Sequence, residues 1–136
     1  MLSFPAQNWQ KVQSSIKISG PLGVASPITH RLYLSDYGTA RNSKKLEELG
    51  ITHVISVIEC VPDLPEVIPQ THRYHLPLPD TPETNILEHL DATTAFITAA
   101  LEENKTNKVM VSNTIYLDHR RLYSFIKLAG SLHARN

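Results

Sequence analysis

The residue type best suited to covalent chemistry occurs once in this chain. Cys60 is the single cysteine among 136 residues. It follows the apolar stretch "ITHVISVIE", and neither a glycine-rich anion-binding loop nor a helix start stands beside it. A thiol in that setting has no positive group to stabilise its thiolate form. The sequence therefore predicts that Cys60 is a small buried or loop thiol.

Serine and histidine offer no clearer reactive site. Ser112 could act as a nucleophile only beside a general base, and the surrounding "KVMVSNTIY" places none next to it. His72 and His75 occur in "HRYHLPL", a stretch of strand type, so their side chains leave the strand on opposite faces. We therefore predict no metal site and no cofactor.

One aspartate stands in a turn that could present it to a substrate. Asp80 lies between Pro79 and Pro82 in "LPLPDTPETN". A carboxyl group so placed could protonate a leaving group. The residue pattern by itself favours the plainer interpretation, which is a turn aspartate.

These residues would be positioned by strands that alternate with helices. Strand-type patterns occur at 30–36, 52–58, 74–76 and 108–111, rich in apolar and β-branched residues. Helical patterns occur between them at 43–49 and 85–104 and after them at 122–132.

Capping residues support the first two helices. Asn42 or Ser43 can cap the helix that Gly50 ends. Asn85 and Glu88 have the spacing of a capping box at the start of the next.

This alternation predicts an α/β fold with a mostly parallel central sheet flanked by helices. Ligands of such sheets bind beside the loops that follow the carboxyl ends of the strands. The loops to consider here begin after Ile58, Leu76 and Val111. Residues 1–27 show no sustained period, so we interpret them as an N-terminal arm or linker, with one domain at 28–136.

The amino-acid composition limits the classes of partner that we expect. Thirteen basic residues balance thirteen acidic ones, so nothing in the net charge suggests nucleic acid or an anionic membrane. The sequence has no apolar run near the length of a membrane span and no signal peptide. We expect a cytoplasmic protein, with the nucleus as the alternative. The oligomeric state does not follow from the sequence.

Three quoted stretches, taken in order, resemble the dual-specificity branch of the protein tyrosine phosphatase superfamily. They are "ITHRLYLSDYGTARNSKKLEELGITHVISV", "YHLPLPDTPETNILEHLDATTAFITAAL" and "KVMV", which together cover residues 28–111. The resemblance implies hydrolysis of phosphotyrosine, phosphoserine and phosphothreonine in proteins. In that family a cysteine thiolate attacks phosphorus, an arginine six positions later holds two phosphate oxygens, and an aspartate protonates the leaving oxygen.

Only the aspartate of this set has a counterpart here. Asp80 corresponds to the general acid. After "KVMV" the family continues with His-Cys, five residues and Arg, whereas this chain continues "SNTIYLDHRR". Asn113 therefore stands for the nucleophile and His119 for the arginine, with Ser112 in place of the histidine. An amide is no nucleophile, and a histidine cannot donate two parallel hydrogen bonds to a phosphate as an arginine does. We therefore predict that the chain is catalytically inactive.

Residues 112–136 diverge from the family pattern and leave room for one amphipathic helix where the family has more. We expect a fold that is incomplete at its C-terminus. The codons of Val111 and Ser112 can read GTAAGT, a common intron start, so a truncated or mis-spliced product is one interpretation. The other is a pseudophosphatase that binds a phosphorylated protein or another protein partner without turnover.

Overall fold

A five-stranded sheet forms the centre of the molecule. The computed structural model describes residues 25–78, 85–113 and 119–135. The sheet has the order β1-β2-β5-β3-β4, in which β1 is antiparallel to β2 and the other neighbours are parallel. Its strands are β1 (Ser26–Thr29), β2 (Leu32–Asp36), β3 (His53–Val57), β4 (Arg73–Leu76) and β5 (Val109–Asn113). The expected mostly parallel α/β sheet is confirmed.

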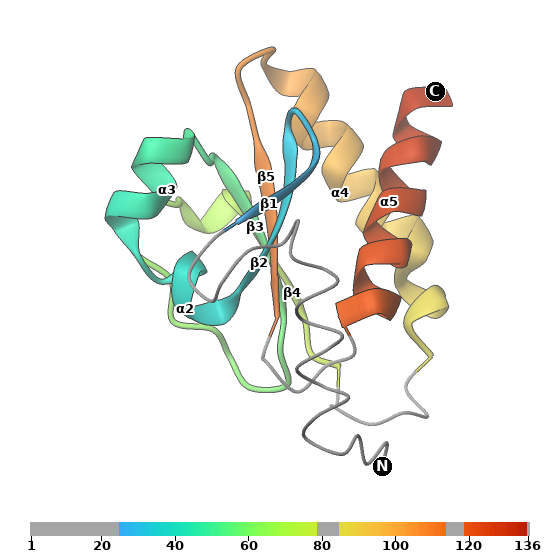
Figure 1. Cartoon of the computed structure of the whole chain (residues 1–136), viewed down its shortest axis with the longest axis horizontal. Helices are drawn as coiled ribbons and strands as arrows, with labels where there is room; N and C mark the ends of the chain where they lie inside the picture. Colours follow the sequence, from blue (N-terminus) through green and yellow to red (C-terminus); the bar gives the residue numbers. More distant parts are fainter. Residues whose placement is uncertain (1–24, 79–84, 114–118, 136) are drawn as a thin grey trace.

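Helices cover both faces of this sheet, as Figure 1 shows. One face carries α2 (Tyr37–Ala40) and α3 (Ser43–Leu49), and the other carries α4 (Leu90–Glu103) and α5 (His119–Arg135). Two short 3-10 turns, η2 (Gln70–His72) and η3 (Ile86–His89), precede β4 and α4. In the described part of the chain, no helix is long and apolar enough to cross a membrane.

The central strands are buried because both faces are covered. All five residues of β3 and all five of β5 are buried. Their alternate side chains enter two separate cores. The larger core lies under α4 and α5 and includes Ile55 and Val111, while the smaller lies under α2 and α3 and includes Val54 and Met110. Continuous apolar runs such as "KVMV" are what a parallel strand buried on both faces requires.

Helix α5 closes the larger core, and its packing follows from its spacing. Its buried residues fall at the i, i+3, i+4 and i+7 positions of one face: Leu122, Phe125, Ile126 and Ala129. Gly130 brings the helix close to β2, because a Cβ atom at that position would lie 3.2 Å from Leu32 Cδ2. The amphipathic helix expected at 122–132 is thus present and packed.

Local signals for α3 are confirmed in detail. The Asn42 side chain accepts a hydrogen bond from Lys45 N at 3.2 Å, and Gly50 ends the helix with a φ of 75°. That left-handed conformation is open to glycine and strained for most other residues.

Two expectations differ from the structure. Strand β1 begins at Ser26, inside the stretch expected to be an arm, and it contains Pro27, which an edge strand tolerates. The capping box at Asn85 does not form either. The Asn85 side chain makes no cap hydrogen bond and instead donates from Nδ2 to Glu88 Oε1 at 3.3 Å. The 3-10 turn η3 therefore precedes the α-helix, and α4 itself begins at Leu90.

Candidate functional site

The candidate site lies at the carboxyl end of the central strands. Register pairing places Asp36 of β2, Asn113 of β5 and Val57 of β3 side by side. This is the edge at which parallel sheets bind their ligands. Asn113 is the last residue of the middle strand of the three.

Asn113 is deeply buried and incompletely hydrogen-bonded. Its exposed fraction is 1%, and its Nδ2 amine has no hydrogen-bond partner among the described residues. A buried amide donor without a partner costs about 1 to 3 kcal/mol relative to a satisfied one. Such unpaired groups in a native fold call for an explanation, and a ligand acceptor is one that chemistry allows.

The neighbouring carboxylate is already used by the fold. Asp36 caps α2, and its Oδ1 accepts a hydrogen bond from Thr39 N at 2.7 Å. That contact satisfies one of the free N–H groups at the start of the helix. Asp36 therefore organises the β2–α2 corner beside Asn113.

One residue earlier in each strand, three serines line up across the sheet. Ser35, Ser112 and Ser56 are paired in register. Within 25–78, 85–113 and 119–135, Ser112 Oγ and Ser56 Oγ are buried and find no hydrogen-bond partner, while Ser35 Oγ donates to the Asp36 carbonyl at 3.1 Å. Among these residues, Ser112 thus lacks the hydrogen bond to a base that a serine nucleophile needs.

Cys60 follows strand β3 at the same edge of the sheet. It is an exposed free thiol in the bend that follows β3. Of the two environments expected for it, the loop thiol is the one observed.

The histidine pair considered from sequence was expected on one strand, but only His75 lies on a strand. His75 lies in β4 with its Nε2 atom 2.7 Å from the Ile58 carbonyl oxygen, whereas His72 ends the turn η2. His72 instead stacks on His53, with ring centroids 3.9 Å apart. Burial, reinforced by His72 and opposed by Glu103, lowers the pKa of His53. The His53 contact was missed because the two histidines lie far apart in sequence.

Known proteins resemble this chain in sequence and in fold. No protein-family model matches the sequence. Over 102 residues the chain is 28% identical to tyrosine-protein phosphatase yvh1 of Schizosaccharomyces pombe, a match that covers 75% of this chain and 30% of the relative. The chain thus spans less than a third of that relative's length.

Solved structures show the same architecture. The crystal structure of DUSP15 superposes with a TM-score of 0.65 at 22% identity, covering 76% of this chain and 64% of that one. Human tyrosine phosphatase-like serine/threonine/tyrosine-interacting protein superposes with a TM-score of 0.62 at 24% identity, covering 79% of this chain and 74% of that one. These likenesses establish the fold, and the match to yvh1 shows a similarity of sequence.

The chain therefore has the fold of the dual-specificity phosphatases, and part of its sequence is similar to a tyrosine-protein phosphatase.

Three positions matter for the chemistry of a dual-specificity phosphatase. The structure describes the side chain of only one of them, Asn113. Asn113, expected at the nucleophile position, lies at the carboxyl end of β5. His119, expected at the arginine position, is the first residue of α5, but its side chain is not among those described. Asp80, expected to be the general acid, falls at 79–84, outside the described residues.

Proposed function

We propose that this chain is a catalytically silent dual-specificity phosphatase domain that binds a phosphorylated segment of a protein partner without hydrolysing it. The observation that supports this most directly is the buried amide of Asn113 at the carboxyl end of the central strand β5. At that place the family resemblance calls for a cysteine.

The chemical argument rests on what can accept a phosphoryl group. The family mechanism needs a thiolate that forms a bond to phosphorus while the leaving oxygen takes a proton. The lone pair of a side-chain amide is delocalised into its carbonyl, and the group carries no ionisable proton near neutral pH. Asn113 can therefore donate hydrogen bonds to phosphate oxygens but cannot form the covalent intermediate.

No other described residue at this edge supplies the missing nucleophile. Ser112 Oγ is buried and has no hydrogen-bond partner among the described residues, so none of them is placed as a base to remove its proton. Cys60 is an exposed thiol in the bend that follows β3, with no anion-binding loop in the sequence around it. These observations support the proposal that neither residue replaces the missing nucleophile.

Binding without turnover is consistent with the same geometry. The Nδ2 amine of Asn113 has no acceptor among the residues that the structure describes, and phosphoryl oxygens are acceptors. Relatives with this fold bear names of phosphatases and of one tyrosine phosphatase-like interacting protein. A phosphorylated protein segment is therefore the occupant we propose.

The first test is hydrolysis of an aryl phosphate by the purified chain beside an Asp80→Ala variant. We expect both to match the buffer blank. Turnover by the parent chain that Asp80→Ala abolishes would refute the proposal, because it would show an unrecognised nucleophile working with this acid. A double variant, Asn113→Cys with His119→Arg, tests whether restoring the two expected residues restores any turnover.

The second test addresses binding. A phosphotyrosyl model peptide and its unphosphorylated twin, each fluorescently labelled, are titrated with the chain, and anisotropy is measured. We expect tighter binding of the phosphorylated peptide, weakened in an Asn113→Leu variant of similar size. Equal affinity for both peptides would contradict the proposed occupant while leaving the absence of turnover intact.

A further inference from the structure

A second group of chemically capable side chains lies at the opposite end of the sheet. His53 begins β3, His72 ends η2, and Glu103 ends α4. Strand β3 runs from His53 to Val57, which is the register partner of Asn113. At about 3.3 Å per residue, the group is roughly 13 Å from the candidate phosphatase site.

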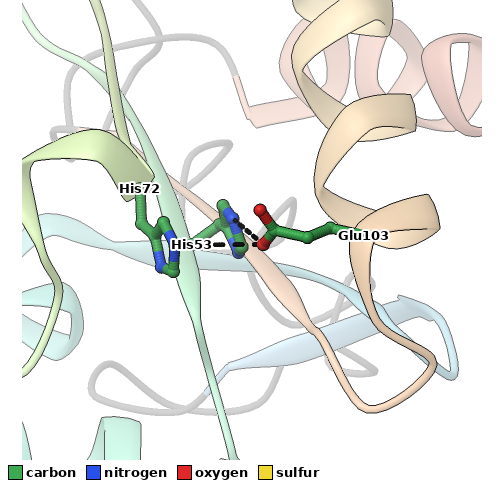
Figure 2. Close-up of side chains that lie close together, drawn as sticks. All are labelled: His53, His72 and Glu103. Atoms are coloured by element: carbon green, nitrogen blue, oxygen red, sulfur yellow. Dashed lines mark ion pairs between the residues drawn. The ribbon is translucent and has the colours of Figure 1, made fainter.

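The three side chains lie close together, as Figure 2 shows. Glu103 Oε1 lies 3.9 Å from His53 Nε2 and 4.0 Å from His72 Nε2. One ligand atom from each residue falls within 4.8 Å of the others. These distances exceed a hydrogen bond, for which about 3.2 Å is the usual upper limit, so neither imidazole donates directly to the carboxylate.

Both rings can present Nε2 as a lone pair toward the carboxylate. His72 Nδ1 lies 3.0 Å from the Thr52 carbonyl oxygen, which only accepts, so that nitrogen carries the proton in the neutral ring. His53 Nδ1 lies 2.8 Å from Thr52 Oγ1. That hydroxyl can accept from His53, because its own proton can go to the Lys108 carbonyl oxygen at 3.0 Å.

Thr52 therefore orients both histidines through a carbonyl and a hydroxyl. Metal-binding histidines are commonly held in this way, with the outer ring nitrogen donating to a protein oxygen and the inner one free to coordinate. Two imidazoles and one carboxylate form a ligand set that suits zinc and leaves a fourth position open to water.

We propose that His53, His72 and Glu103 form a binding site for a divalent transition-metal ion, with Zn²⁺ as the best match. Two bonds of about 2.1 Å at a tetrahedral angle separate their donor atoms by about 3.4 Å. The measured separations of 3.9 and 4.0 Å are within about half an ångström of that value. Glu103 can move its carboxylate closer to the two Nε2 atoms, because its side chain is 62% exposed.

Coordination also requires the two rings to turn apart. They are stacked with an angle of 16° between their planes, so their Nε2 lone pairs lie in two nearly parallel planes and do not point at one ion. His53 is held, because its side chain is 6% exposed and it makes an edge contact with Phe96 at 5.8 Å. His72 is 28% exposed on a one-turn helix, so it is the ring expected to rotate.

Such an ion would join three elements at the amino end of the sheet: strand β3, turn η2 and the last turn of α4. It would add metal bonds to the contacts that these segments already make, such as the ring stack and the edge contact of His53 with Phe96. The site is distinct from the candidate site at the carboxyl ends of the strands, so its occupancy bears on stability rather than on phosphoryl chemistry.

The test is isothermal titration of the chelator-treated protein with Zn²⁺, beside His72→Gln, Glu103→Gln and the control His30→Gln. His30 is exposed in the turn before β2, so its replacement removes an imidazole outside the cluster. We expect one ion per chain for the parent and the control, with at least tenfold weaker binding in the other two variants.

Two further readouts separate this site from casual surface binding. Co²⁺ should give the intense visible absorption of a tetrahedral centre, and Zn²⁺ should shift the His72 ring proton resonances as the stack opens. A rise in melting temperature on adding Zn²⁺ should be smaller in His72→Gln. Absence of binding, or binding that both cluster variants retain at parent affinity, would overturn the proposal and leave the cluster as a structural ion pair.

Discussion

Replacing Ile126 by alanine should destabilise the fold strongly, because this side chain is the centre of the apolar face of α5. Its exposed fraction is 0%, and it packs in the larger core with Leu34 and Val111. The change removes three buried carbon atoms, which at about 0.8 kcal/mol each amounts to about 2.4 kcal/mol of transfer free energy. A cavity left behind raises the expected loss toward about 5 kcal/mol.

Leu128→Ala is the matched control on the same helix. Leu128 is 43% exposed, so its truncation should change the free energy of unfolding by well under about 1 kcal/mol. Urea unfolding followed by circular dichroism gives both values, and the urea dependence itself should stay the same.

The comparison of the two variants is decisive for α5. A loss from Ile126→Ala no larger than that from Leu128→Ala would refute the packing of α5 against the sheet. The larger core would then not be covered by α5.

Three further predictions concern other parts of the fold. Gly50→Ala should lower the free energy of unfolding by about 1 to 2 kcal/mol, because φ is 75° there. Backbone strain alone should cause this loss, since the nearest side chain, Lys108, lies 3.8 Å from the added methyl group, and urea unfolding measures it. Arg31→Met should cost about 2 kcal/mol or more in the same assay, since the Arg31 guanidinium donates to three carbonyl oxygens around the end of α4 at 2.7–2.9 Å. In the presence of a chelator, stability should fall as pH drops below 6.5, because burial lowers the pKa of His53 and the unfolded chain then binds more protons than the folded one. His53→Gln should flatten that fall, and an unchanged pH profile would contradict it.

Sequence patterns predicted the elements that have strong local signals. The apolar run before Ser112 and the β-branched run around Ile55 are the two central strands. Asn42 and Gly50 mark the ends of α3 as their cap chemistry indicates. These features were predictable because a continuous apolar run and a pair of helix-capping residues are both visible within a short stretch of sequence.

The features that were missed depend on distant pairing. Strand β1 is short and contains Pro27, so only its pairing with β2 makes it a strand. The stacking of His53 on His72 follows from the parallel register that pairs Val54 with Arg73. Aligning the two predicted strands in that register would have brought the preceding histidines together, whereas the spacing of His72 and His75 drew attention to the wrong pair.

The candidate site was predictable only in part. The strand pattern alone placed Asn113 just after a strand at 108–111, whereas the structure extends that strand to Asn113 and puts it at the centre of the sheet. Interpreting it as the position of a nucleophile required the family resemblance. Its unpaired Nδ2 amine and its 1% exposure could not be read from the sequence, because both depend on what the neighbouring strands and helices place around it.

The central claim is that no residue of this chain accepts a phosphoryl group. The most direct measurement is intact-protein mass spectrometry after incubation with an aryl phosphate and rapid acid quench, with an authentic cysteine-dependent phosphatase as the positive control. The account predicts an unmodified mass for this chain under conditions that label the control. A mass increase of one phosphoryl group, mapped by peptide sequencing to any residue near the carboxyl ends of the strands, would contradict it.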